Sequence, residues 1–204
     1  MRIKIRILSV LMLLSGLLLQ PLWADVSAPQ LLIKQTADEV LASIKSNKQE
    51  YSTAPAKLYS MVDEKVLKNF DFDRMTDLAL GRYKRQVEVG QKDKLVRAFR
   101  DLLVRTYAKA LLEYTDEVIV FLPMRGAVDK GEVTVRTEVE QKGGFPIPIN
   151  YEMYEAEGKW KVYDLSIDNI SLVTNYRSSF AQEIKANGVD GLIKTLQDRN
   201  KEKS

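Results

Sequence analysis

The chain has 204 residues, with 31 basic and 28 acidic side chains and a formal net charge of +3. It contains neither cysteine nor histidine, which excludes disulfides, metal sites built on thiolate or imidazole, and nucleophile systems that need a histidine base. An enzyme of this composition would be restricted to carboxylates, tyrosine, lysine or serine.

The first two dozen residues have the pattern of a secretory signal peptide. MRIKIR carries three positive charges, the apolar run ILSVLMLLSGLLL follows, and the small residue Ala24 suits the position before a cleavage site. We predict a signal peptide over residues 1–24 and a soluble mature chain over residues 25–204. Because no cysteine is available to carry an anchor, a bacterial lipoprotein is excluded. A mature chain of this length suits a single domain.

The apparent basicity of the chain comes from this leader. Without Arg2, Lys4 and Arg6, 28 basic residues face 28 acidic ones, so the predicted mature chain is close to neutral. A protein that binds nucleic acid usually has a clear basic excess, and we therefore expect no nucleic-acid partner.

The first part of the mature chain reads as helices. Apolar residues at steps of three and four predict a helix from Pro29 to about Lys48, and a second, shorter helix from Ala54 to Phe70. The carboxylates of DFD, residues 71–73, are expected to cap a following helical segment that ends at Gly81. The longest helix is predicted from about Lys92 to Tyr114.

The pattern then changes from helical periodicity to strict alternation. Four strands are predicted, over residues 118–124, 132–141, 147–155 and 159–167. The turn residues KGG and EG between the last three make these strands an antiparallel meander. Two further helices, separated at Asn187-Gly188, are predicted to close the chain. The fold class is therefore α+β, with a four-stranded antiparallel sheet packed on its apolar face against several helices.

The alternation in the last strand assigns side chains to two faces. We expect Tyr163, Leu165 and Ile167 on the apolar face, and Asp164, Ser166 and Asp168 on the opposite one. Five aromatic side chains are expected to converge between sheet and helices: Phe99, Tyr107, Tyr151, Tyr163 and Tyr176. Such rigid rings could hold the two layers apart and leave a slot, or they could belong to a filled core.

Two polar groupings suggest other functions. Tyr151, Tyr163 and Asp164 have the residue types that an isomerase uses for proton abstraction beside a carbonyl, which makes a small enzyme an alternative. The basic stretch GRYKR, residues 81–85, could contact a phosphate headgroup or an acidic partner, or be an ordinary solvated run. A protein-interaction module without a ligand is the third alternative.

Three features together resemble one family. They are RMTDLALGRYKRQ followed by KLVRAFRDLLVRTYAKALLEYTDEVIVFLP, the long stretch from VRTEVEQKGGFPIPINYEMYE to VDGLIKTL, and a leader ahead of a cysteine-free chain. In order and spacing they resemble the MlaC, or toluene-tolerance, family of periplasmic phospholipid-binding proteins. The resemblance covers about residues 28–200.

The resemblance implies a carrier of glycerophospholipids rather than an enzyme. It implies a fold similar to nuclear transport factor 2, with an apolar lipid cavity between sheet and helices. It also implies periplasmic location, no cofactor, phospholipid as cargo, and a monomer that maintains outer-membrane lipid asymmetry. The implied partners are an inner-membrane ABC transporter complex with MCE domains and an outer-membrane lipoprotein–porin complex.

The face assignments then give fourteen predicted lipid-binding residues. They are Phe99, Leu103, Tyr107, Val135, Val139, Ile149, Tyr151, Tyr163, Leu165, Ile167, Ile170, Leu172, Val173 and Tyr176. No catalytic or metal-binding residue is predicted.

Overall fold

The computed structural model describes residues 27–113, 117–141 and 143–202. The predicted leader, residues 1–24, lies outside the described residues, as does Tyr114 at the end of the longest predicted helix. The α-helices are α1 (Ala28–Thr53), α2 (Pro55–Lys65), α3 (Phe72–Leu80), α4 (Val89–Tyr107) and α5 (Leu172–Glu202). Short 3-10 helices are η1 (Leu67–Asn69), η2 (Gly81–Gln86), η3 (Ala108–Glu113) and η4 (Val128–Lys130).

The strands form one antiparallel sheet in which sequence neighbours are also spatial neighbours. They are β1 (Val118–Ala127), β2 (Glu132–Glu140), β3 (Ile147–Ala156), β4 (Lys159–Ile167) and β5 (Ile170–Ser171), paired in that order. The predicted four-strand meander is confirmed, and β5 adds a short fifth strand at the edge next to β4. The α+β fold class is likewise confirmed.

Local sequence signals account for most of the helix boundaries. The Asp71 carboxylate accepts a hydrogen bond from the Arg74 backbone N–H at 2.9 Å and so begins α3, as predicted. Gly81, with φ of 54°, ends the same helix. Helix α4 begins earlier than predicted because Glu88 and Gln91 form a reciprocal cap, with the Glu88 N–H donating to Gln91 Oε1 at 3.0 Å.

The C-terminal helices are joined rather than separated by a loop. Helix α5 runs from Leu172 to Glu202, but Gly188 interrupts it with φ of 70° and ψ of −175°. Only glycine adopts this backbone conformation readily, so the predicted break at Asn187-Gly188 is present as a kink.

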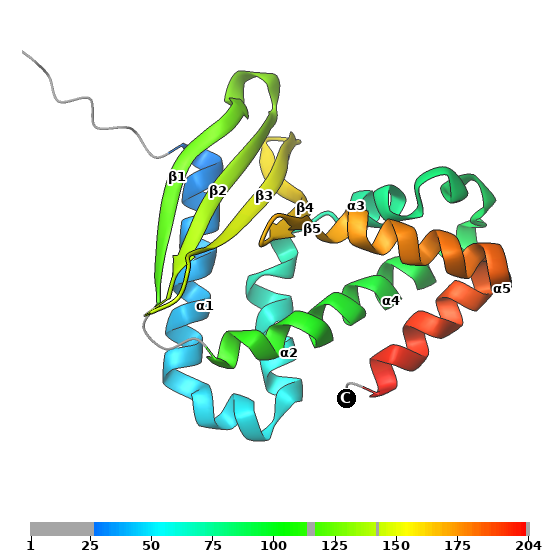
Figure 1. Cartoon of the computed structure of the whole chain (residues 1–204), viewed down its shortest axis with the longest axis horizontal. Helices are drawn as coiled ribbons and strands as arrows, with labels where there is room; N and C mark the ends of the chain where they lie inside the picture. Colours follow the sequence, from blue (N-terminus) through cyan, green and yellow to red (C-terminus); the bar gives the residue numbers. More distant parts are fainter. Residues whose placement is uncertain (1–26, 114–116, 142, 203–204) are drawn as a thin grey trace, which may run out of the picture.

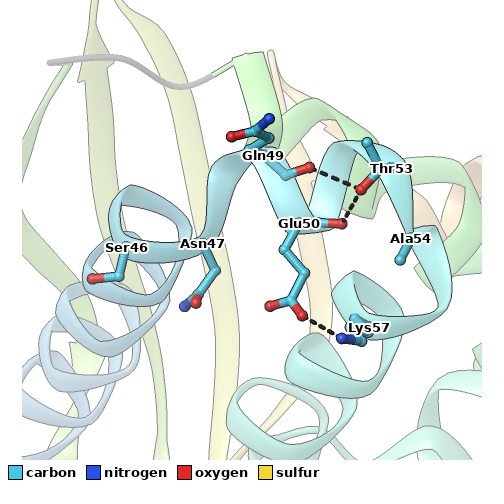
Figure 2. A pocket seen from close by; sticks show the side chains of 7 residues that line it. All are labelled: Ser46, Asn47, Gln49, Glu50, Thr53, Ala54 and Lys57. Atoms are coloured by element: carbon cyan, nitrogen blue, oxygen red, sulfur yellow. Dashed lines mark hydrogen bonds and ion pairs between the residues drawn. The ribbon is translucent and has the colours of Figure 1, made fainter.

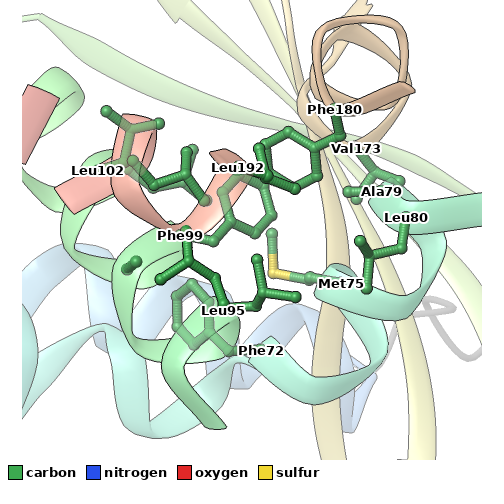
Figure 3. Close-up of a cluster of buried hydrophobic side chains, with 14 of the residues drawn as sticks. Phe72, Met75, Ala79, Leu80, Leu95, Phe99, Leu102, Val173, Phe180 and Leu192 are labelled. Carbon is green, nitrogen blue, oxygen red and sulfur yellow. The ribbon is translucent and has the colours of Figure 1, made fainter. Parts of the chain in front are cut away.

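The buried side chains form three clusters rather than one. The helical cluster lies among α3, α4 and α5 and includes Met75, Leu95, Phe99, Phe180 and Leu192 (Figure 3). A second cluster joins α1, α2 and η3. The third lies between the sheet and the first part of α1, which runs along the strands in Figure 1. The sheet is thus shared between α1 and the layer of α3, α4 and α5.

Candidate functional site

The inner face of the sheet, which is turned toward the helices, changes in burial along its strands. Register places directly paired residues on the same face. The inner face consists of Ile119, Phe121, Val133, Val135, Thr137, Val139, Ile147, Ile149, Tyr151, Met153, Val162, Leu165 and Ile167. At one end Val133, Val135, Met153 and Val162 are buried and pack with Ile33 of α1.

At the other end of this face, apolar side chains are only half-buried. They are Ile119, Val139, Ile147, Ile149 and Ile167, in neighbouring positions on all four long strands. Apolar surface that remains accessible forgoes about 25 cal/mol per Å² of stabilisation. A contiguous set of such side chains on a face that is otherwise core is typical of a ligand-binding surface. We call these five residues the open end of the inner face.

The helical cluster gathers the predicted residues that come from helices. Phe99, Leu103, Leu172 and Val173 are members of it, and Tyr107, Leu165 and Tyr176 pack against it. The Phe99 ring meets the Tyr176 ring edge to face, with centroids 5.0 Å apart. Leu165 comes from β4, so it links the inner face of the sheet to the helical cluster. Seven of the fourteen predicted residues are therefore brought together here.

The exposed fractions separate core residues from residues that can border a hollow. Phe99 and Val135 are 0% exposed, so they border no open space. Leu103, Leu172 and Val173 are at most 7% exposed, so they contribute little to the wall of any cavity. The half-buried members of the predicted set are Tyr107, Val139, Ile149, Tyr151, Tyr163, Leu165, Ile167 and Tyr176.

Tyr163 lies on the other face of the sheet, so the predicted face is wrong. Met153 pairs with Val162 and Glu152 with Asp164, so a β-bulge inserts one extra residue between them. The Tyr163 ring is stacked under the Arg74 guanidinium, 3.9 Å from the ring centroid. Its other neighbour is the Tyr154 ring, which Arg74 also covers at 4.2 Å. Strict alternation gave no sign of this bulge.

Ile170 is at the periphery of the site. It is 59% exposed, at the start of β5, and follows Asp168 and Asn169, which both have positive φ. These two residues form the tight turn between β4 and β5. Ile170 pairs with Ile167, so it lies on the inner face beside the open end, on the strand at the edge of the sheet.

Tyrosine hydroxyls are the polar groups among these apolar side chains. Burial raises the pKa of Tyr151 to about 12, although a hydrogen bond with Thr137 acts in the opposite direction. Burial also raises the pKa of Tyr107 and Tyr176, whose hydroxyls are hydrogen-bonded to each other. Because all three phenols stay protonated at neutral pH, the surface that they share with the aliphatic residues is uncharged.

The three residues of the enzyme alternative are not gathered at one site. Tyr151 is on the inner face, whereas Asp164 is on the outer face opposite Glu152. Tyr163 shares the outer face with Asp164, but Arg74 covers its ring. The Asp164 carboxylate accepts hydrogen bonds from Ser171 Oγ at 2.5 Å and from the Val173 N–H at 3.1 Å. It therefore caps the start of α5 and positions Leu172 and Val173. Within the described ranges, no group of three acidic side chains is placed to hold a metal ion.

A polar hollow lies elsewhere, at the bend of α1. It has a volume of about 580 Å³ and is lined by Ser46, Asn47, Gln49, Glu50, Thr53, Ala54 and Lys57 (Figure 2). Asn47 has non-helical backbone angles there, and Lys57 forms an ion pair with Glu50 across the hollow. None of the fourteen predicted residues lines it, and its polar wall does not suit an apolar ligand.

The basic stretch GRYKR forms η2, between α3 and α4. Arg82 lies over the Tyr83 ring, 5.0 Å from its centroid, and Lys84 Nζ is 3.7 Å from an Asp77 carboxylate oxygen. Part of its charge is thus balanced locally. None of the described helices is long and apolar enough to cross a membrane.

Comparison with known proteins identifies relatives along nearly the whole chain. The family model described as MlaC protein matches residues 34–198. The intermembrane phospholipid transport system binding protein MlaC of Haemophilus influenzae is 24% identical over 174 residues, which are 84% of this chain and 81% of that protein. The toluene tolerance protein ttg2D of Pseudomonas putida is 27% identical over 169 residues, or 82% of this chain and 78% of that one.

A solved structure supports the same relationship. The phospholipid-binding protein from Ralstonia solanacearum, determined in complex with a phospholipid, superimposes with a TM-score of 0.79 and 34% identity. The match covers 85% of this chain and 97% of that one. The sequence match and the fold agree with the resemblance inferred from sequence motifs, and this chain belongs to the MlaC family.

Proposed function

We propose that this chain is a phospholipid carrier that moves glycerophospholipids between membranes, and that it performs no chemistry on them. The acyl chains lie between the inner face of the sheet and helices α4 and α5. The observation that carries this placement is the open end of the inner face, where five aliphatic side chains on four strands are half-buried.

Tyr107, Tyr151, Leu165 and Tyr176 complete the proposed wall, because they are half-buried and border the same region. Phe99, Leu103, Val135, Leu172 and Val173 support that wall from behind. Tyr163 has no place in it, since it faces Arg74 on the outer side of the sheet.

The energy of lipid transfer explains why such a carrier needs an enclosed apolar surface. Each methylene exposed to water costs about 0.8 kcal/mol, so two acyl chains of about 30 methylenes would lose roughly 24 kcal/mol. A surface about as apolar as a bilayer balances this cost in both directions. The direction of transport is then set by the partners that load and unload the carrier.

The proposed setting is the periplasm, reached through the leader over residues 1–24. There the carrier exchanges lipid with an inner-membrane ABC transporter complex bearing MCE domains and with an outer-membrane lipoprotein–porin complex. The near-neutral charge of residues 25–204 suits this shuttle role, because a strongly basic carrier would be retained at anionic membrane surfaces.

Two substitutions on neighbouring positions of β3 test the placement. Ile149→Glu puts a charge on the inner face, where it would have to be buried against acyl chains. Asn150→Glu puts the same charge on the outer face opposite Arg136, and is the matched control. Each protein is produced with its own leader in a Gram-negative host and weighed intact by native mass spectrometry.

We expect the parent protein and Asn150→Glu to carry a mass increment that solvent extraction identifies as phospholipid. The lipid-bound fraction of Ile149→Glu is expected to be at least about tenfold lower. If Ile149→Glu had a native circular dichroism spectrum and bound as much lipid as the parent protein, the acyl chains would not lie on this face. A parent protein that stays lipid-free after incubation with liposomes would favour an interaction module instead.

A further inference from the structure

Strand β1 is apolar on both faces, unlike its neighbour β2. Ile119 and Phe121 are on the inner face, while Val118, Val120 and Leu122 are on the outer face. An antiparallel strand with one face in water normally alternates apolar and polar residues, as β2 does with Thr134, Arg136 and Glu138 outside. The outer row of β1 does not have this polar pattern, and Val118 is 56% exposed.

The strand also lies at the edge of the sheet. Among the described residues, β1 pairs with β2 on one side and with no strand on the other (Figure 1). Its second half is protected in the usual ways, by Pro123, by a bulge between Leu122 and Arg125, and by the Gln30 side chain, which donates to the Leu122 carbonyl at 3.2 Å. The first half, Val118 to Phe121, has no proline, bulge or charge.

Hydrogen bonds at the end of the β2–β3 ladder fix the direction of the backbone groups in the first half. The Glu155 N–H donates to the Gly131 carbonyl at 2.9 Å, so Gly131 and every second residue after it in β2 direct their backbone groups to β3. The residues between them direct theirs to β1, where they pair with Val118 and Val120. The N–H and C=O groups of Ile119 and Phe121 are therefore directed to the free edge, in the arrangement that an added strand requires.

The negative charge beside β1 indicates what kind of strand could be added at its free edge. Glu138 and Glu140 lie on the outer face of β2, directly beside Val120 and Val118, and neither is in an ion pair within the described part of the chain. A second copy of β1 would bring a second pair of these carboxylates toward the same edge. Lysine or arginine side chains on the outer face of an incoming strand would instead reach across β1 toward them.

We propose that Val118–Phe121 is a docking site for an extended segment of a partner protein, which adds a sixth strand to the sheet. The segment alternates apolar residues, on the side of Ile119 and Phe121, with basic residues on the side of Val118 and Val120. Main-chain hydrogen bonds supply the affinity and the two glutamates supply the charge preference. The site goes beyond lipid carriage and does not depend on it.

The test uses two fluorescently labelled peptides of stated sequence. One is acetyl-Lys-Val-Lys-Val-Lys-Val-Lys-amide, and the other has glutamate in place of each lysine. Binding to the full-length protein, processed by the host, is measured by fluorescence anisotropy. The variant Ile119→Pro removes an N–H that faces the free edge while leaving the β1–β2 hydrogen bonds intact, and Ile119→Thr is the matched control that keeps this N–H.

We expect the lysine peptide to bind the parent protein and Ile119→Thr equally, and Ile119→Pro about tenfold more weakly. The double variant E138K/E140K tests the same site without a proline. We expect this double variant to bind the lysine peptide about tenfold more weakly than the parent protein does, and to bind the glutamate peptide more tightly. Lipid loading of E138K/E140K, whose substitutions are on the outer face, should equal that of the parent protein, which separates this site from the lipid site.

Three results would overturn the proposal. The first is a parent protein that does not bind the lysine peptide, and the second is one that binds both peptides equally. The third is a concentration-dependent dimer, seen by sedimentation equilibrium, that Ile119→Pro converts to monomer, which would assign the edge to a second copy.

Discussion

The phenol of Tyr151, on the inner face of the sheet, makes the stability of the protein depend on pH in the alkaline range. Burial raises its pKa to about 12, whereas an unfolded tyrosine ionises near pH 10.0. Between these values the unfolded chain has lost a proton that the folded protein keeps, so the free energy of unfolding falls as the pH rises. We predict that the free energy of unfolding of Tyr151→Phe falls less steeply than that of the parent protein over this range, by roughly 1 kcal/mol per pH unit. Urea unfolding at a series of pH values measures the two slopes.

The range from pH 7 to 9 is the control for the comparison of the parent protein with Tyr151→Phe. From pH 7 to 9 the Tyr151 phenol is protonated in both states, so the parent protein and Tyr151→Phe should show parallel pH profiles. The profiles should diverge only above pH 10. Parallel profiles up to pH 12 would mean that the phenol titrates as freely in the folded protein as in the unfolded chain.

Single residues also show where sequence patterns lose information. The alternation of Tyr163, Leu165 and Ile167 predicts one shared face, and two of the three are on it. The bulge before Asp164 moves Tyr163 to the other side, where Arg74 covers its ring. A bulge depends on how two strands are paired, and the sequence of one strand does not contain that information.

At the scale of elements, the kink of α5 depends on one glycine. Gly188 has φ of 70° and ψ of −175°, a conformation that a Cβ atom makes strained. We predict that Gly188→Ala lowers the free energy of unfolding by about 1–3 kcal/mol, although no neighbouring atom lies within 4 Å of the added Cβ. Urea denaturation of the two proteins at neutral pH measures the difference.

Gly90→Ala is the control for this prediction. Gly90 lies in the first turn of α4, has no positive φ, and also has no atom within 4 Å of an added Cβ. Alanine there should leave stability unchanged or raise it by up to about 1 kcal/mol. If the two substitutions had equal effects, backbone strain at the kink would not be the cause.

The helix boundaries that could be predicted from the sequence are those set by residues close to them in the chain. The capping carboxylate of Asp71, the stop at Gly81 and the break at Gly188 are all short-range and correctly predicted. The apolar stripe of the longest helix continues past Tyr107, but the backbone tightens there into η3. A 3-10 turn keeps similar side chains on one side, so hydrophobic periodicity does not distinguish it from an α-helix.

At the scale of the whole molecule, the core is divided and the proposed site lies between its parts. The helical cluster and the sheet cluster meet through Phe70, which packs against both, while the open end of the inner face is covered by neither. Sequence analysis identified the apolar residues of both layers, because burial selects residue type. It did not separate Phe99 from Tyr107, since a wall and the core behind it have the same composition.

This division predicts that lipid contributes to the stability of the folded protein. A ligand that binds only the folded state stabilises it by mass action, by about 4 kcal/mol at a thousandfold excess over its dissociation constant. We predict that protein stripped of lipid in denaturant and refolded melts at a lower temperature than protein that keeps its lipid. Adding phospholipid back should restore the melting temperature in proportion to the logarithm of its concentration, as scanning calorimetry would record.

The variant Ile149→Glu makes this prediction specific to the open end of the inner face. Its charge occupies the surface that acyl chains would cover, so added phospholipid should leave its melting temperature unchanged. Asn150→Glu, with the same charge on the outer face, should respond as the parent protein does. If lipid stabilised all three proteins equally, the acyl chains would lie away from this face. If lipid stabilised none of the three proteins, the sheet and the helices would pack against each other without a bound lipid.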